Sequence, residues 1–220
     1  MIKLIARPEL LSKLHIEERL IKAIQLLRII GAIRYNNILQ VKLMRDPDYN
    51  VAHHIHLLNI HAASLYEGIK TFCKLCRSLK DMEYYQNNQD KLKLILRENG
   101  NASSFCNQVL KPIRNGIAFH FEEDVIRKNL KDYIEFCIHN NMEVILVSGE
   151  SELMKDTTYG IADNVTINFV LDRIAGKDLP VEEKVERFSK ELLKLTSTFL
   201  EILDNIVGEL LEGYGVAITN

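Results

Sequence analysis

Near the end of the chain, residues 180–215 read PVEEKVERFSKELLKLTSTFLEILDNIVGELLEGYG. Apolar residues recur here at alternating steps of four and three, which is the spacing of one face of an α-helix. The stripe consists of Val181, Val185, Phe188, Leu192, Leu195, Phe199, Ile202 and Ile206. Pro180 precedes it and Gly213 and Gly215 follow it, as is typical of helix boundaries. We therefore predict a long amphipathic C-terminal helix that packs on a helical bundle or on a partner chain.

The chain as a whole is poor in turn residues. It has 10 glycines and 4 prolines among 220 residues. Sandwiches and barrels need many tight turns, and disordered chains are enriched in proline and glycine. The composition therefore excludes these classes and predicts a mainly α-helical fold built from long elements.

Helical periodicity also dominates the first 141 residues. We expect helices over about 10–44, 51–80 and 81–98. A further helix is expected to be capped by Ser103 or Ser104, because serine is a favoured N-cap residue. The last helix of this part is expected to end at Asn140-Asn141. Residues 1–141 are therefore interpreted as one helical bundle.

The following segment differs in character. Residues 143–149 are rich in β-branched side chains and end in Gly149, and residues 156–160 can pair back to them, so we predict a small β-hairpin over 143–161. Residues 162–174 have β-propensity but keep a helical spacing, and we interpret them as a helix. Residues 142–220 are thus expected to form a hairpin-like segment followed by C-terminal helices.

Charge and cysteine content limit the classes of partner. The net charge is −2, so the chain has no overall positive field, and a nucleic-acid role would need a local basic patch. Four cysteines without a secretory pattern are typical of reduced intracellular thiols. No apolar run of about 18 residues is available to span a membrane, and the apolar run at the N-terminus is too short for a signal peptide. These features predict a cytoplasmic protein with no membrane partner.

The strongest chemical pattern is the stretch 111–121, which reads KPIRNGIAFHF. It combines Arg114 and Asn115 with His120. Arginine is a permanently charged fork that fits a phosphate, and histidine transfers protons near neutral pH. On one α-helix Arg114 and His120 point about 120° apart. Two copies related by a two-fold axis can place both residues around one cleft, so we expect a homodimer.

This pattern resembles the motif of HEPN domains, in which an arginine is followed after four to six residues by a histidine. Residues 61–68, HAASLYEG, are similar to a Leu-Tyr-Glu-Gly helix of uncharacterised bacterial proteins of this kind. HEPN domains are helical bundles, and many are metal-independent ribonucleases of toxin, abortive-infection and RNA-processing systems, whereas others only bind. The resemblance covers roughly the first 140 residues. It implies RNA as a partner, Arg114 as the phosphate-stabilising residue, His120 as general acid and base, Asn115 in support, and no metal or other cofactor.

Other polar residues are candidates for the surroundings of this motif. A supporting pocket would contain Tyr66, Glu67, Arg34 and Asn37. Glu67 can instead pair on the surface with Lys70, which lies three residues further on. A basic stripe for RNA phosphates would contain Lys70, Lys74, Arg77 and Lys111, although such charges are most often solvated.

Two clusters suggest metal chemistry without meeting its requirements. Cys73 and Cys76 form a single C-x-x-C, whereas a structural zinc site usually has four ligands, so we interpret both as core residues. The histidines in 53–61 lack a zinc-protease signature. The alternative to a ribonuclease is a non-catalytic helical module for dimerisation or for binding an antitoxin or another partner protein.

Overall fold

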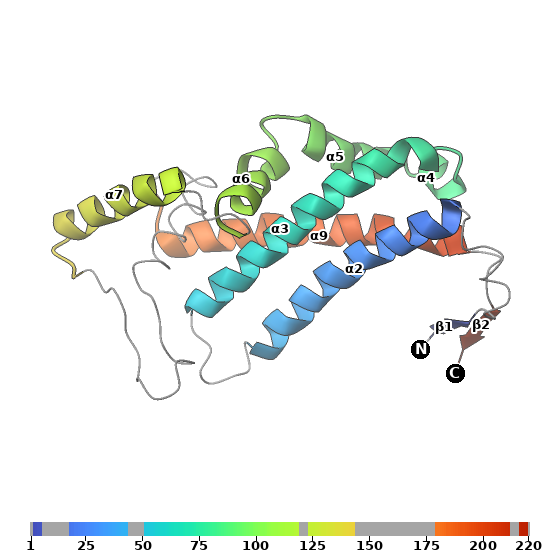
Figure 1. Ribbon diagram of the computed structural model, residues 1–220, viewed down its shortest axis with the longest axis horizontal. Coiled ribbons are helices and arrows are strands. Elements are labelled where there is room, and N and C mark those ends of the chain that lie inside the picture. The colour runs from blue at the N-terminus through green and yellow to red at the C-terminus, as the bar shows by residue number, and fades with distance from the viewer. Residues whose placement is uncertain are drawn as a thin grey trace.

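The computed structural model describes residues 2–5, 18–43, 51–118, 123–143, 179–211 and 216–219, and every structural statement below refers to these ranges. Over them the chain is mainly helical, which confirms the mainly α-helical class predicted from the sequence (Figure 1). The hairpin predicted over 143–161 lies outside the described residues except for Glu143. The helix predicted over 162–174 and residues 10–17 of the first predicted helix also lie outside them.

Three long helices form the body of the fold (Figure 1). They are α2 (Glu18–Leu43), α3 (Val51–Leu75) and α9 (Val181–Leu211). The C-terminal stripe predicted from the sequence supplies much of the core, with Phe188, Leu192, Phe199, Ile202 and Ile206 buried among residues of α2 and α3. The burial of this face holds α9 on the bundle of its own chain.

Shorter elements follow α3 and cover one side of the three helices. They are η1 (Cys76–Leu79), α4 (Glu83–Asn87), α5 (Gln89–Gly100), η2 (Cys106–Leu110), α6 (Lys111–Ile113) and η3 (Arg114–Ala118). Their buried residues Leu79, Leu92, Ile95, Leu110 and Ile113 join the same core. The candidate motif is thereby anchored against α3.

At Gly68, α3 packs closely against both α2 and α9. A Cβ at this position would lie 2.7 Å from Cγ2 of Ile29 on α2 and 3.1 Å from Cε1 of Phe199 on α9. Only glycine fits without displacing these groups. Beside it, the rings of Phe72 and Phe199 meet edge to face with centroids 5.7 Å apart.

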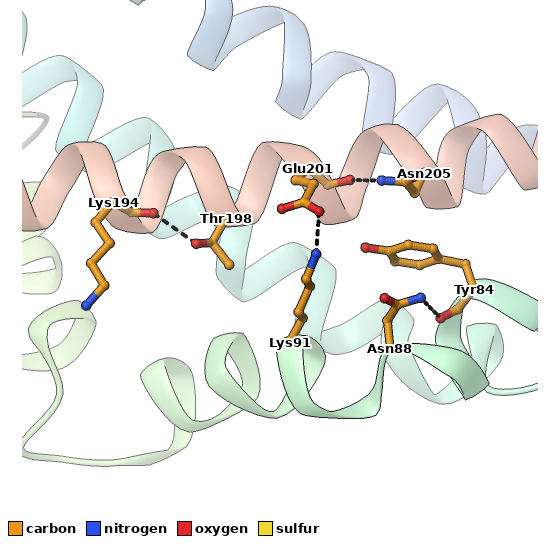
Figure 2. Close-up of polar contacts among 7 residues, drawn as sticks. All are labelled: Tyr84, Asn88, Lys91, Lys194, Thr198, Glu201 and Asn205. Atoms are coloured by element: carbon orange, nitrogen blue, oxygen red, sulfur yellow. Dashed lines mark hydrogen bonds and ion pairs between the residues drawn. The ribbon is translucent and has the colours of Figure 1, made fainter.

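Polar contacts hold α9 against α4 and α5. The carboxylate of Glu209 accepts hydrogen bonds from the backbone N–H groups of Glu83 and Tyr84, at 2.7 and 2.9 Å, and so caps the first turn of α4. About two turns further back on α9, Glu201 pairs with Lys91 of α5 (Figure 2). These polar contacts lie along the outer edge of the interface between α9 and the helices α4 and α5. The inner part of this interface is apolar.

The helix α7 (Glu123–His139) has its own small cluster, formed by Tyr133 and Cys137 with Leu130, rather than a share of the main core. Its C-terminal end matches the prediction at Asn140-Asn141. Asn141 adopts φ 52°, the N–H of Met142 donates to the carbonyl of Cys137, and the N–H of Asn141 donates to that of Ile138. This is a Schellman-type helix end, for which asparagine is suited because it tolerates the left-handed region.

The two ends of the chain pair as strands (Figure 1). β1 (Ile2–Ile5) is antiparallel to β2 (Val216–Thr219), with Ile2 opposite Thr219 and Ile5 opposite Val216. This pairing was not predicted from the sequence. Across the described residues, no helix is both long and apolar enough to cross a membrane.

Candidate functional site

The segment that carries Arg114 is fixed at its start by a dense set of hydrogen bonds. The hydroxyl of Ser104 accepts from the N–H of Asn107 at 3.2 Å, so Ser104 rather than Ser103 is the N-cap. The side-chain amide of Asn107 donates to the carbonyls of Glu98, Asn99 and Asn101 at 2.9–3.1 Å. The end of α5 is therefore fastened to the start of the motif helix.

The motif helix contains two widened turns of the π type, η2 and η3, separated by the single α-turn α6. In η2 the N–H of Lys111 donates to the carbonyl of Cys106, five residues earlier. Pro112 follows directly. Its ring would crowd a carbonyl in the preceding turn of a regular α-helix, and it has no N–H to donate, so the wider turn relieves both problems. Widened turns of this kind occur frequently at functional sites.

Arg114 begins the second widened turn and contacts α3. Its Nε lies 2.7 Å from Oε1 of Glu67, and its Nη1 donates to Oδ1 of Asn115 at 3.1 Å. Both atoms are buried, and neither has an aligned hydrogen-bond partner. The first contact is therefore an ion pair rather than a hydrogen bond. Within the described ranges no side chain binds Nη2. The side chain of Arg114 remains 29% exposed.

Glu67 is shared between two cations. Besides Arg114 it contacts Lys70, whose Nζ lies 4.0 Å from the same oxygen and 5.9 Å from the centre of the Tyr66 ring. Two positive charges against one negative charge leave a net charge of about +1 at this point. Burial raises the pKa of the Tyr66 hydroxyl, and Cys106 and Glu67 raise it further while Arg114 lowers it. The hydroxyl therefore stays protonated at neutral pH.

Some of the predicted site residues lie together in the structure, and others do not. Arg114, Asn115, Glu67, Tyr66 and Lys70 are brought together. We name these five residues the Arg114 centre. His120 lies outside the described residues, so its place relative to this centre is open. Gly116, inside the second widened turn, is buried.

Two of the predicted pocket residues have other surroundings. Arg34 on α2 forms an ion pair with Asp204 on α9, and no contact joins it to the Arg114 centre in the described residues. Asn37 is half-buried on α2. Its neighbour Asn36 is the buried amide of this helix and donates to Oγ of Ser64 at 3.2 Å. The helical spacing did not single out Asn36.

The basic residues expected to bind RNA lie unevenly around the centre. Lys111 is exposed one turn before Arg114, and Lys74 is exposed one turn after Lys70, so both extend the positive charge. Arg77 is exposed further along, in η1. On α5, by contrast, Lys91 pairs with Glu201 and Lys93 with Asp90.

The clustered cysteines and His61 are packed within the helical bundle. Cys73, Cys76 and Cys106 are free thiols, and burial raises their pKa values to about 11, 12 and 12. His61 is buried, and its Nε2 lies 2.9 Å from Oγ1 of Thr196 on α9. The residues with described positions include no group of three or more potential metal ligands.

Comparison of the chain with family models, with curated proteins and with solved structures gave no match.

Proposed function

We propose that the chain is a HEPN-like, metal-independent endoribonuclease whose RNA phosphate binds at Arg114. The observation that carries the proposal is the way in which the guanidinium of Arg114 is held. Glu67 and Asn115 hold its Nε and Nη1, and no described residue takes Nη2. An arginine fixed in this way loses little conformational freedom when it meets a phosphate oxygen. The surplus positive charge from Lys70, with Lys111 nearby, favours an anion at the same point.

The proposed chemistry needs only groups of the chain and of the RNA. The ribose 2′-oxygen attacks phosphorus, and its proton passes to the neutral imidazole of His120. The bond between phosphorus and the 5′-oxygen breaks, and the imidazolium returns the proton to that oxygen. The products are a 2′,3′-cyclic phosphate and a 5′-hydroxyl. Arg114 stabilises the charge that develops on the phosphorane oxygens, and no metal takes part.

Glu67 is proposed as a positioning residue rather than a catalytic one. Its carboxylate is held by Arg114 and Lys70 and fixes the direction of the guanidinium. The HEPN resemblance suggests a bacterial toxin or abortive-infection setting, in which an antitoxin or another protein would block this centre until it is needed.

The second candidate function is a non-catalytic helical module for dimerisation or protein binding. One observation favours it: α2 exposes several large apolar side chains that the described part of the chain does not cover. In that case Arg114 would serve only its ion pair with Glu67, and RNA would not be its ligand.

The test is RNA cleavage in EDTA by the wild type and by Arg114→Ala, Arg114→Lys and Arg187→Ala. Arg187 is an exposed arginine on α9 and serves as the control. We expect a loss of about 100-fold or more in Arg114→Ala, with partial activity in Arg114→Lys because lysine keeps the charge but not the fork. Equal cleavage by the wild type and Arg114→Ala, or no cleavage by any of them, would remove the ribonuclease proposal.

A further inference from the structure

α2 exposes six large apolar side chains whose positions are symmetric about Gly31. They lie four, seven and ten residues to either side of it, as the pairs Leu27 and Tyr35, Ile24 and Ile38, and Ile21 and Val41. Each residue is between 44% and 61% exposed. Gly31 is exposed as well, and a Cβ built on it would meet nothing within 4 Å.

Four of the six side chains form one stripe, and the outer two flank it. At 100° per residue, Ile24, Leu27, Tyr35 and Ile38 lie within about 40° of Gly31 around the helix axis, and Ile21 and Val41 lie about 80° to its two sides. A different face of α2 carries the residues buried toward α3 and α9: Ala23, Leu26, Ile30 and Ile33. α2 therefore has two apolar faces, and the described part of the chain covers one of them.

The symmetry of the stripe suits a second copy of the same chain. In an antiparallel helix pair around a two-fold axis, each residue lies level with the partner residue that is equally far from the axis on the other side. With the axis at Gly31, Leu27 is level with the partner's Tyr35, and Ile24 with the partner's Ile38. Every exposed large apolar side chain described on α2 then has an apolar counterpart.

The centre of the stripe and its charges fit the same arrangement. Gly31, which has no side chain, allows the two backbones to approach closely at the crossing point. Arg34 and Arg28 lie beside the stripe, about 60° from Gly31 on its two sides, and the charge of Arg34 is paired with Asp204. The interface core would thus be apolar with a polar rim, which is the usual composition of a homodimer contact.

The area is adequate for a stable dimer. Six large side chains, each about half exposed, present on the order of 500–600 Å² of apolar surface, which is at the upper end of what a monomer usually leaves in water. Two such faces bury about 1,000–1,200 Å², close to the lower bound for a specific interface.

We propose that α2 is the homodimer interface of this protein, with two copies packed antiparallel about a two-fold axis at Gly31. The surface differs from the Arg114 centre, whose contacts are to α3, so this dimer does not depend on RNA cleavage. It also differs from the homodimer expected from the sequence, in which Arg114 of two copies would share one cleft.

The test is the association state of the full chain by sedimentation at protomer concentrations of about 1–100 µM. Gly31→Arg should fold, because the monomer has open space there, but should block the close approach of two helices. We expect a dimer in the wild type and a dissociation constant at least about 100-fold weaker in Gly31→Arg. Gly208→Arg is the matched control, since Gly208 is an exposed glycine on α9 with nothing within 4 Å of its Cβ. A monomeric wild type, or equal dimers in both variants, would overturn the proposal.

Oxidative cross-linking tests the direction of the helices. Gly31→Cys should form a disulfide-linked dimer, because the two cysteines meet at the axis. Ile24→Cys should not, since its two copies lie about 21 Å apart along an antiparallel pair, beyond the reach of a disulfide. The wild type reports the background from its four cysteines. Equal cross-linking of both variants would indicate a parallel pair and contradict the proposal.

Discussion

Oε1 of Glu67 lies 2.7 Å from Nε of Arg114, and this ion pair joins α3 to the widened turn η3. The contact uses Nε of the guanidinium, while the Arg114 side chain as a whole remains 29% exposed. A carboxylate in this position both orients the arginine and lowers the local positive charge. These two effects can be separated by experiment.

Glu67→Gln should strengthen RNA binding and weaken cleavage. The amide keeps the size of the side chain but removes one negative charge, so RNA affinity at low salt should rise about 3- to 10-fold, with a salt slope steeper by up to about one unit. Cleavage of bound RNA should fall about 10-fold because Arg114 loses its fixed direction. Filter binding across a salt series and single-turnover cleavage measure the two effects. Glu123→Gln, which breaks the exposed pair with Arg127 on α7, is the control. A parallel loss of binding and cleavage would contradict the positioning role.

Stability should depend on pH through His61. The side chain is 1% exposed, and burial lowers its pKa to about 4, against 6.5 for the free group. Between these values the unfolded chain binds a proton that the folded chain does not, so the stability falls as the pH drops from 6.5 to 4. The loss is about 3 kcal/mol by pH 4.

Urea unfolding at pH 7 and at pH 4.5 measures this dependence. His61→Gln should flatten it, whereas His56→Gln, at an exposed position on the same helix, should leave it unchanged. An unchanged dependence in His61→Gln would assign the effect to other groups.

Gly68→Ala should destabilise the bundle. The added methyl would lie 2.7 Å from Cγ2 of Ile29, a β-branched side chain with little freedom to turn away. We expect a loss of about 1–3 kcal/mol in the free energy of unfolding, measured with urea. Gly208→Ala, in open space on α9, should instead gain up to about 1 kcal/mol from helix propensity. The same effect from both substitutions would mean that close packing at Gly68 is unimportant.

The two neighbouring serines before the motif helix should respond differently to alanine. Ser104 caps the helix through the N–H of Asn107 and also donates to the carbonyl of Glu98, so Ser104→Ala should cost about 1–2 kcal/mol. Ser103 is exposed and contributes its backbone N–H to Oδ1 of Asn101, which alanine retains. Ser103→Ala should therefore change the stability by less than about 0.5 kcal/mol. Thermal unfolding of both variants decides the matter, and equal losses would refute the assignment of the cap.

Much of the helical architecture could be predicted from the sequence because periodicity and capping are local properties. The stripe from Val181 to Ile206 and the end at Asn140-Asn141 were predicted in this way. The strands at the two chain ends were not, since their pairing joins residues at opposite ends of the sequence and short runs such as Ile2–Ile5 carry no period of their own.

The site could be predicted only in part, because its contacts join residues on different helices. The sequence suggested Glu67 for the pocket of Arg114 because it is a polar residue on an otherwise apolar helix, and the structure shows this contact. It also suggested Arg34, which pairs with Asp204 instead. The partner of a polar side chain on another helix depends on how the helices are rotated against each other, and spacing along one helix does not contain that information. The widened turns around Pro112 could not be predicted either, because the sequence periodicity was analysed at 3.6 residues per turn.

The proposed cleavage of RNA relies on a histidine and needs no metal ion. RNA is incubated in EDTA with the wild type, with His120→Ala and with His139→Ala, an exposed histidine of α7 that serves as the control. We expect 2′,3′-cyclic phosphate ends from the wild type and from His139→Ala, with a loss of about 100-fold or more in His120→Ala. Cleavage by all three proteins alike, or by none of them, would contradict it.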